Sequence, residues 1–459
     1  MDKDRRIALG VVALAIVTYA GFFGGAGWNQ DAQFDLTRAL VERRTLYVDG
    51  YAVNTEDVSV GRHGHTYINK PPGVSMLAAI PYALVFAAEK VLHLPIDDLA
   101  RANAWIVTAA TCGVCGALVG ATLFLYGRKI GASPPAALTV ALSILFGTIV
   151  FEYSTMLFAH VPSALFLLLA FVWARDRPLL AGIAVGAATA CFYVCALAAM
   201  ALLIVTRRKT LRFVAGGLPF AALLAIYHAV CFGSPWVTSV EVSQRFTHKG
   251  FLFGVFRLPT FEALWGLTFS PFRGLFYTSP VLLFALVGIL VMIRKRKMAA
   301  ELIAIAVTAI VFIIVISGFN GWNGGWAFGP RYLLPIIPLL GVTMMFAATL
   351  ARPLWLLLAA LSVAINFIAT SVGPMPPDTL KDPLRQWYLP IFSTGQIDGV
   401  KVGKVAVQRE AGNLGEFLFG EKSRSSVFPI LIWITFGTLL LLRASGRYTS
   451  TPNGSCHPL

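Results

Sequence analysis

Long apolar runs, separated by short polar and basic segments, make up most of this chain. A membrane-spanning helix needs roughly 20 mostly apolar residues, and by this measure the sequence predicts about twelve spans. The predicted spans are 7–23, 104–126, 136–151, 161–173, a pair of short helices within 179–205, 213–232, 281–293, 302–319, 332–350, 354–372 and 428–442. The pattern therefore predicts an all-α polytopic membrane protein.

Composition agrees with a lipid environment, because 57% of the 459 residues are hydrophobic, 13% are charged and the mean hydropathy is +0.73. The net charge of +15 comes from clusters between the apolar runs, at 128–129, 175–177, 207–209 and 294–297. Such clusters favour the cytoplasmic side and anionic lipid, so we expect no nucleic-acid partner. Both chain ends are then predicted to be cytoplasmic. The first run exceeds the usual signal-peptide core of about 7–15 residues and is interpreted as an uncleaved anchor.

The run 74–92 is also apolar enough to span, but a crossing there would move every later basic cluster to the outer side. We therefore expect a juxtamembrane helix on the outer surface, inside a long extracytoplasmic first loop at 24–101. Further outer segments are predicted at 233–280, at the turn 320–331 and at 373–427, where broken alternation at 400–407 indicates a short strand or hairpin. A catalytic membrane region would thus cover 1–372, and residues 428–459 would form the last span and a cytoplasmic tail.

The cysteines show no disulfide framework and no metal cluster. Cys112 and Cys115 have a C-x-x-C spacing, but within an apolar helix the packing of small residues is the better interpretation. Ionisable residues are nearly absent from the centres of the predicted spans. A transporter more often keeps such groups near the bilayer centre, so this distribution favours chemistry at the outer surface.

Two carboxylates follow the first span. Asp31 is either the N-cap of a short helix or a base that takes a proton from an acceptor hydroxyl, and the spacing does not decide between them. Asp35, one helical turn later, is the alternative base, or pairs with Arg38 as a structural ion pair.

Two cations are candidates for binding a phosphate. Lys70 lies in the run from Tyr67 to Gly73, where two prolines exclude a helix, and is either a phosphate contact or a lysine at headgroup level. Arg331, with Tyr332 beside it, follows a glycine- and tryptophan-rich turn, and its planar fork suits a phosphate. An arginine on the outer side runs against the positive-inside trend, which favours a functional role.

Weaker candidates lie in two other outer segments. Glu152 and His160 could bind a metal, but a third ligand is lacking, so a helix cap and a hydrogen-bonded histidine are the better interpretations. Arg273 lies in a proline- and glycine-containing segment and is a further possible substrate contact. We expect no cofactor, and a divalent metal has no support beyond this pair.

In the order of these parts, the sequence resembles the C-type glycosyltransferase superfamily, specifically bacterial members similar to protein O-mannosyltransferases and the lipid A aminoarabinose transferase. The resemblance rests on an acidic residue after the first span, an Arg-Ala-Leu helix at Arg38 and an aromatic-x-x-Lys-Pro-Pro loop ending at Pro72. It continues with the paired short helices and the Gly-Pro-Arg-Tyr turn at Gly329, and extends to about residue 372.

This resemblance implies an enzyme of the inner membrane that transfers a hexosyl or pentosyl group, with inversion, from a polyprenyl-phosphate-linked donor. The acceptor would be a lipid, a glycan such as a cell-envelope glycan, or a protein at the extracytoplasmic face. Asp31 would match the catalytic carboxylate, and Lys70 and Arg331 the phosphate contacts. Many relatives have Asp-Glu where this chain has Asp31 followed by Ala32, which keeps Asp35 as an alternative. The rival functions are a flippase or transporter of a polyprenyl-linked or amphipathic substrate, and a glycan ligase or polymerase.

Overall fold

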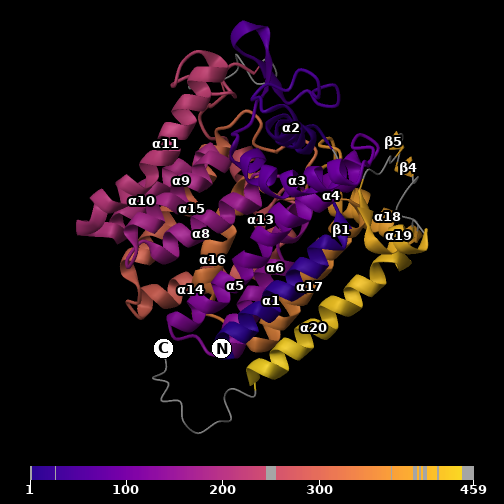
Figure 1. Ribbon diagram of the computed structural model, residues 1–459. Helices are drawn as coiled ribbons and strands as arrows, with labels where there is room; N and C mark the ends of the chain where they lie inside the picture. Colours follow the sequence, from indigo (N-terminus) through magenta and orange to yellow (C-terminus); the bar gives the residue numbers. More distant parts are fainter. Residues whose placement is uncertain are drawn as a thin grey trace.

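The computed structural model describes residues 3–25, 27–243, 255–373, 375–395, 401–402, 405–406, 411–420 and 423–446. Helices predominate throughout this part of the chain, and each of its sheets has two strands. The helices form one bundle, with α2 and the β4–β5 pair at one end and the start of α1 at the other (Figure 1).

The longer helices of the bundle follow the predicted apolar runs. They are α1 (Lys3–Ala20), α3 (Gly73–Val91), α4 (Ala100–Thr108), α5 (Val114–Lys129), α6 (Pro134–Phe146), α8 (His160–Trp173), α9 (Pro178–Cys191), α10 (Ala196–Thr206), α11 (Thr210–Phe232), α14 (Leu283–Arg294), α15 (Ala299–Ser317), α17 (Arg352–Val372) and α20 (Phe428–Gly446).

Shorter helices occupy the connections. They are α2 (Trp28–Arg38), η1 (Ala39–Arg43), η2 (Arg62–Gly64), η3 (Ala109–Gly113), α7 (Val150–Ser154), η4 (Tyr193–Cys195), η5 (Arg207–Lys209), α12 (Phe261–Thr268), α13 (Leu275–Thr278), η6 (Pro280–Leu282), η7 (Arg331–Ile336), α16 (Ile337–Met344), η8 (Leu384–Tyr388), α18 (Leu389–Thr394), α19 (Leu414–Phe419) and η9 (Arg424–Val427).

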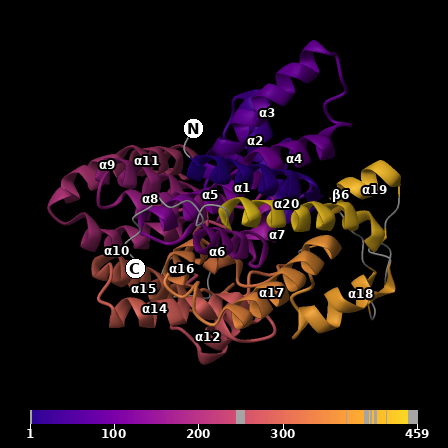
Figure 2. The same ribbon diagram turned by 90° about the horizontal axis from the view of Figure 1, so that it is seen from below.

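Three antiparallel strand pairs complete the described structure. They are β1 (Phe22–Phe23) with β6 (Gly412–Asn413), β2 (Val58–Val60) with β3 (Thr66–Ile68), and β4 (Lys401–Val402) with β5 (Val405–Ala406). The first pair joins the end of α1 to the segment before α20, and these two helices run alongside each other (Figure 2). The last pair forms a hairpin within the stretch whose alternation indicated one.

Six helical segments are long and apolar enough to cross a membrane, and five further apolar helices are shorter. The six are Gly73–Val91, Ala100–Lys129, Tyr193–Phe232, Ala299–Ser317, Arg352–Val372 and Arg424–Gly446. Some predicted spans extend past the end of the observed helix. The first predicted span, for example, ends at residue 23, whereas α1 ends at Ala20 and is followed by β1. The total of twelve spans stays a prediction.

Ion pairs gather at the end of the bundle that carries the start of α1. Arg128, at the end of α5, pairs with Asp4 at 3.1 Å, and Lys129 pairs with Asp176. Arg175 pairs with Glu301 at the start of α15, and Lys209 Nζ donates to the carbonyl of Arg175. Three of the four basic clusters, 128–129, 175–177 and 207–209, therefore lie near one another at this end, as the positive-inside pattern predicts for a single membrane face.

The helix α3 begins and ends at the opposite end of the bundle. It starts directly after Lys70, Pro71 and Pro72, and a short turn joins its last residue to α4. The continuous helical segment Ala100–Lys129 then runs down to the Arg128–Asp4 pair. Although α3 is as long and apolar as a span, it therefore does not connect the two ends, and it projects from the bundle (Figure 2).

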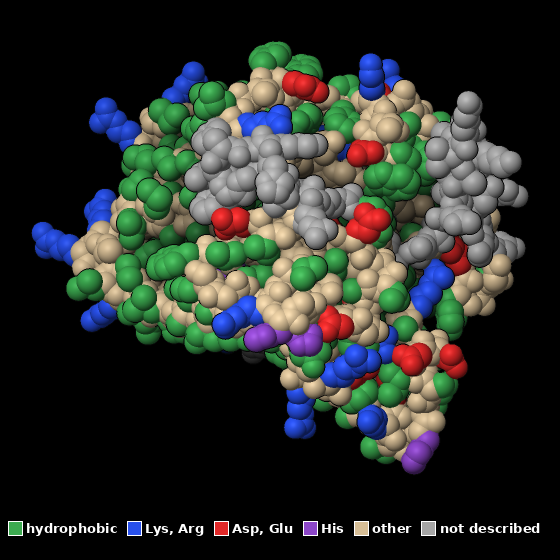
Figure 3. Space-filling model, turned by 90° about the horizontal axis from the view of Figure 1, so that it is seen from above, with side chains coloured by type: hydrophobic (Ala, Val, Ile, Leu, Met, Phe, Trp, Pro, Cys, Tyr) green, Lys and Arg blue, Asp and Glu red, His purple; other side chains and the backbone are tan. Residues whose placement is uncertain are grey.

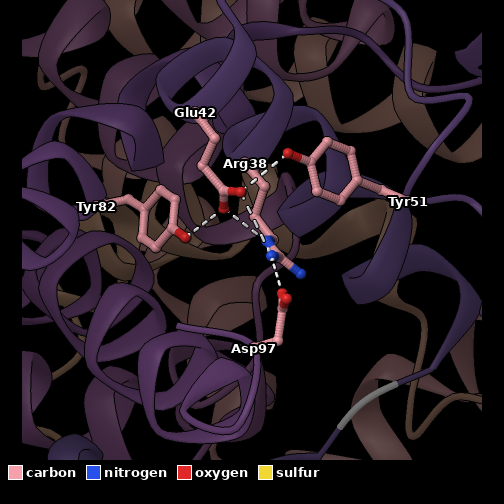
Figure 4. Close-up of polar contacts among 5 residues, drawn as sticks. All are labelled: Arg38, Glu42, Tyr51, Tyr82 and Asp97. Carbon is pink, nitrogen blue, oxygen red and sulfur yellow. Dashed lines mark hydrogen bonds and ion pairs between the residues drawn. The ribbon is translucent and has the colours of Figure 1, made fainter. Parts of the chain in front are cut away.

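A network of polar side chains connects the segment that follows α2 to α3 and to the turn before α4. The Glu42 carboxylate lies at its centre: it pairs with Arg38 at 2.7 Å and accepts hydrogen bonds from the hydroxyls of Tyr51 at 2.9 Å and Tyr82 at 2.5 Å (Figure 4). Arg38 also reaches Asp97, in the turn before α4, at 2.7 Å. The partners of Arg38 are thus Glu42 and Asp97, and the alternative pair with Asp35 is wrong.

The paired short helices predicted within 179–205 are confirmed as α9 and α10, which meet at a break around Phe192 and η4. Two glycines let α9 pack closely on α11: a Cβ at Gly182 would lie 1.9 Å from the carbonyl of Phe213, and one at Gly216 would lie 2.1 Å from that of Leu179. Small residues of this kind allow close approach between helices in a membrane.

Parts of four predicted segments fall outside the described residues. These are residue 26 in the first loop, 244–254 within 233–280, the stretches 374, 396–400, 403–404, 407–410 and 421–422 within 373–427, and the predicted cytoplasmic tail from 447 onward.

Candidate functional site

A cavity of about 580 Å³ lies among the start of α2, the β2–β3 hairpin, the glycine-rich turn before η7 and the segment after α17. It belongs to the end of the molecule that carries α2, opposite the cluster of ion pairs. Viewed from this end, acidic and basic side chains lie among hydrophobic ones (Figure 3). The side chains and backbone that line the cavity belong to Gly27, Trp28, Asn29, Gln30, Asp57, Lys70, Phe158, Gly321, Asn323, Gly324, Gly325, Trp326, Arg331, Tyr332, Met375 and Asp378.

The β2–β3 hairpin brings a carboxylate and a cation together inside this cavity. In the hairpin, Val58 pairs with Ile68; Ser59 is buried and donates to the carbonyl of Ser239 at 2.9 Å, whereas Val60 is exposed. Asp57 precedes one strand and Lys70 follows the other, so the pairing places them side by side. Lys70 Nζ lies 3.1 Å from Asp57 Oδ2.

Asp57 is held as a charged group although it is only 7% exposed. Burial alone would raise the pKa of its carboxyl, but the charge and hydrogen bond of Lys70, and then the charge of Arg331, bring the pKa below its usual value. Asn69 contributes a longer contact, Nδ2 to Asp57 Oδ1 at 3.4 Å, and also donates to Ser243 Oγ at 3.2 Å. The carboxylate thus stands between the two cations and is compensated by both.

Arg331 enters the cavity between two aromatic rings. Its guanidinium carbon lies 5.0 Å from the ring centroid of Phe158 and 5.0 Å from that of Tyr332, and Nη2 donates to the Tyr332 hydroxyl at 3.1 Å. Its Nε is buried and has no hydrogen-bond partner among the described residues. The rings fix the plane of the guanidinium and leave N–H groups available to an anionic ligand.

His160 lies behind this pair of rings. It stacks on Phe158 with centroids 5.8 Å apart and meets Tyr332 edge-on at 5.4 Å. Phe192, from the break between α9 and α10, stacks on Tyr332 at 6.0 Å and also meets His160 edge-on at 5.2 Å. His160 therefore does not line the cavity itself and packs against the residues that hold Arg331.

Arg273 lies beneath the glycine-rich turn. Its side chain is fully buried, and it donates from Nε to the carbonyl of Asn323 at 3.0 Å and from Nη2 to that of Gly325 at 2.7 Å. Burial lowers the pKa of this guanidinium to about 10, which leaves it charged at neutral pH. Arg273, predicted as a substrate contact, is thus hydrogen-bonded to the backbone of two residues that line the cavity.

Glycine is required within that turn. Gly324 has a φ of +77°, a conformation that side-chain-bearing residues rarely adopt, and a Cβ there would lie 3.0 Å from Arg331 Nε. The turn can therefore follow the arginine side chain closely only because position 324 lacks a side chain.

The two carboxylates of α2 do not line the cavity, although the three residues before Asp31 do. The helix begins at Trp28 with Gly27 as its cap, so Asp31 lies inside the first turn and is not the N-cap. Asp35 is only 3% exposed, and burial, followed by repulsion from Asp31, raises the pKa of its carboxyl to about 8. Asp35 is therefore mostly protonated at neutral pH, which makes it a poor proton acceptor there.

Two further predicted residues lie away from the cavity. Tyr67 is buried against Phe232, with ring centroids 5.5 Å apart, on the hairpin beside Lys70. Glu152, in α7, is fully buried, and neither of its carboxylate oxygens has a hydrogen-bond partner among the described residues. Within the described parts of the chain, no group of three or more His, Cys, Asp or Glu side chains could hold a metal ion.

The structure thus brings together Lys70, Arg331 and Tyr332 from the predicted set. Sequence reasoning missed Asp57, Phe158 and Asp378. The alternation on both sides of the turn at η2 could have indicated the hairpin, and with it the proximity of Asp57 to Lys70. No comparable signal exists for Phe158 and Asp378, which reach the cavity through the packing of distant helices.

No protein-family model matches the chain, and no curated protein matches it in sequence. Solved structures that are similar to it include ArnT from Cupriavidus metallidurans bound to undecaprenyl phosphate, with a TM-score of 0.49 and 13% identity over 96% of this chain and 75% of ArnT. For apo ArnT the TM-score is 0.46 at 14% identity, again over 96% and 75% of the two chains.

Arabinosyltransferase EmbB from Mycobacterium smegmatis gives a TM-score of 0.43 at 14% identity, over 98% of this chain and 41% of EmbB. ArnT and EmbB are both C-type glycosyltransferases, the superfamily that the sequence resembles. At identities and TM-scores this low, the likeness does not show what this chain acts on. The function proposed below rests on the cavity.

Proposed function

We propose that this chain is an integral membrane glycosyltransferase that takes a sugar from a polyprenyl-phosphate-linked donor and transfers it to an acceptor at the extracytoplasmic face. The observation that supports this most strongly is that Lys70 and Arg331, from opposite halves of the sequence, line one cavity. Two fixed cations in a partly buried, aromatic-lined site suit the phosphate of such a donor.

The location of the cavity supports an outer active site. The basic residues Arg128, Lys129 and Arg175 form ion pairs at the other end of the bundle, and basic clusters favour the cytoplasm. The cavity would then open at or near the outer membrane surface, where the apolar faces of the helices would contact the polyprenyl chain. The start of α1 and the end of α20 lie at the end of the bundle that carries these ion pairs (Figure 1), and we propose that both face the cytoplasm.

In the proposed reaction, an acceptor hydroxyl or amine attacks the anomeric carbon of the donor sugar. The bond between that carbon and the phosphate oxygen breaks, and its electron pair stays on the phosphate. Lys70 and Arg331 would stabilise this developing charge, and because they are held in place beforehand, little reorganisation is needed. A carboxylate accepts the proton from the acceptor, and a single displacement inverts the anomeric carbon.

Two carboxylates compete for the role of base. Asp57 lines the cavity but is engaged with Lys70, so it could accept a proton only after the donor phosphate has taken over that cation. Asp31 is half-buried and follows Gln30, which lines the cavity, and the resemblance to C-type enzymes implies this residue. Asp35 is the weaker proposal, since its carboxyl holds a proton at neutral pH.

The purified full-length protein in liposomes tests this function directly. Undecaprenyl phosphate carrying radiolabelled arabinose, glucose or mannose is supplied with a cell-envelope extract as the acceptor source, and released undecaprenyl phosphate is measured. We expect release with at least one donor, and loss of release in Asp57→Asn or Asp31→Asn, whichever residue is the base. Movement of the donor across the bilayer without release would contradict the proposal and support a flippase. Full release in both carboxylate variants would contradict the mechanism.

A further inference from the structure

Two tryptophans line the cavity and remain half-exposed. Trp28, at the start of α2, is 42% exposed, and Trp326, in the glycine-rich turn, is 53% exposed. The charged residues of the cavity, by contrast, lie deeper: Asp57 is buried and Lys70 is mostly covered. The cavity therefore has a charged inner part and an aromatic mouth.

Two amide side chains beside Trp28 have oxygens that the protein leaves without hydrogen bonds. Gln30 is only 4% exposed, and Asn29 Oδ1 and Gln30 Oε1 are both buried without a partner among the described residues. The amide nitrogen of Gln30 is held by long contacts to the carbonyl of Gly25 at 3.5 Å and to Met375 Sδ at 3.4 Å. Buried amide oxygens are costly when unpaired, and both residues line the cavity, so a ligand with hydroxyl donors would satisfy them.

Exposed tryptophans alone would not indicate a ligand, because such residues are common at the membrane surface. Trp265 in α12, for example, is 50% exposed and does not line the cavity. Trp28 and Trp326 differ because they share the cavity with the unpaired amide oxygens. An acyl chain cannot donate to those oxygens, whereas a sugar presents hydroxyl donors around its rim and C–H groups that pack on an aromatic ring.

We propose that the mouth of the cavity is a saccharide-binding subsite formed by Trp28, Asn29, Gln30 and Trp326. The ring of a neutral sugar packs on a tryptophan while its hydroxyls donate to the amide oxygens of Asn29 and Gln30. A Cβ at Gly325 would meet nothing within 4 Å, so open space lies next to Trp326 for the ring. This inference rests on the proposed function, and it narrows the chemistry that the mouth accepts to carbohydrate.

The sugar has two sources. It is either the sugar carried by the donor lipid, whose phosphate binds Lys70 and Arg331, or a sugar residue of a glycan acceptor that approaches from outside. Both present the same hydroxyl-bearing ring to the mouth, and the two sources differ in whether the sugar is linked to a lipid phosphate.

The experiment measures three dissociation constants for the full-length protein in nanodiscs. The probes are undecaprenyl phosphate, undecaprenyl phosphate carrying glucose or arabinose, and soluble maltopentaose or a linear arabinan pentasaccharide. The variants are Trp326→Ala and Gln30→Leu, with Trp265→Ala as the matched control of similar exposure. Because Trp326 is half-exposed, its substitution keeps the test valid even if the buried Gln30 variant folds poorly.

We expect Trp326→Ala and Gln30→Leu each to raise the dissociation constant of a sugar-bearing probe about tenfold. The dissociation constant of undecaprenyl phosphate should stay within about twofold of wild type. If only binding of the glycosylated lipid weakens, the subsite holds the sugar of the donor. If only binding of the pentasaccharide weakens, the subsite holds a sugar of a glycan acceptor. Unchanged binding of every sugar-bearing probe, or equal loss in Trp265→Ala, overturns the subsite. If undecaprenyl phosphate fails to bind wild-type protein but a pentasaccharide binds through Trp326, the proposed function fails while the subsite stands.

Discussion

Asp57 and Lys70 form an ion pair across the ends of a two-stranded hairpin, with Oδ2 and Nζ 3.1 Å apart. Arg331 lines the same cavity as this pair. The pair is largely buried, with the two side chains 10% and 15% exposed, respectively. Asp57 thus compensates both Lys70, by this pair, and Arg331, by its charge. A donor phosphate would compete with Asp57 for both of them.

Breaking this pair from one side should destabilise the protein. In Lys70→Ala, Asp57 keeps only Arg331 as its cationic neighbour, and we expect a loss of about 3–5 kcal/mol in the free energy of unfolding, as for other buried pairs. The double variant Asp57→Asn/Lys70→Gln replaces the pair by two amides and should recover much of this loss. Thermal unfolding in detergent would measure both changes. Equal stability of Lys70→Ala and wild type would show that the pair is not coupled.

The raised pKa of Asp35 predicts a specific dependence of stability on pH. An unfolded aspartate ionises near pH 3.9, whereas the folded protein keeps this proton up to about pH 8. Between these values the folded state binds more protons, so the contribution of Asp35 to stability falls as pH rises through the window. The variant Asp35→Asn should remove this slope between pH 5 and pH 8, as measured by the midpoint of thermal unfolding.

A control for that measurement is Asp31→Asn, which removes a neighbouring charge that helps to raise the Asp35 pKa. This variant should move the decline in stability to lower pH without abolishing it. An unchanged slope in Asp35→Asn would show that another group causes the pH dependence.

In the Glu42 network, we expect buried side chains to contribute more to the free energy of unfolding than exposed ones. The Tyr82 hydroxyl donates to the Glu42 carboxylate at 2.5 Å, so Tyr82→Phe should cost about 1.5–3 kcal/mol, as for other hydrogen bonds to charged groups. Asp97 also pairs with Arg38, but its side chain is 89% exposed, so Asp97→Asn should change stability by only about 0–1 kcal/mol. Chemical unfolding of the two variants side by side would measure the difference, and equal losses would contradict this account.

Arg273 should act on ligand binding without touching the ligand. A lysine there keeps a positive charge but cannot donate along the same two directions to the carbonyls of Asn323 and Gly325. We expect Arg273→Lys to loosen the turn that packs on Arg331 and to weaken undecaprenyl phosphate binding about tenfold. Hydrogen exchange at 321–326 should rise in the same variant. Weakened binding with unchanged exchange would instead indicate direct contact with the ligand.

Local patterns predicted most of the helices and the end of the bundle at which the site lies. The runs of apolar residues predicted the helices. The basic clusters led to the interpretation of 74–92 as a helix on the outer surface, and α3 projects from the bundle (Figure 2), but its place relative to a membrane stays a prediction. The exact spans were harder to predict, because apolar residues continue past helix ends into turns, as at Phe22 and Phe23 after α1.

The site could be predicted only where chemistry and local conformation coincide. Lys70 beside two prolines and Arg331 after a glycine-rich turn carry such signals, and both line the cavity. Asp31 and Asp35 carried an equal signal, but the helix that holds them turns only its first residues, 28–30, into the cavity. The direction of a helix face depends on packing with distant elements, which spacing along the chain does not contain.

The central claim is that Lys70 and Arg331 together bind the phosphate of a polyprenyl lipid. The most direct measurement is an experimental structure of the protein in nanodiscs with undecaprenyl phosphate. Our account predicts the phosphate between Lys70 Nζ and the Arg331 guanidinium, with oxygens within hydrogen-bonding distance of both and with Asp57 displaced from Lys70. A phosphate bound elsewhere, with the Asp57–Lys70 pair intact, would contradict it.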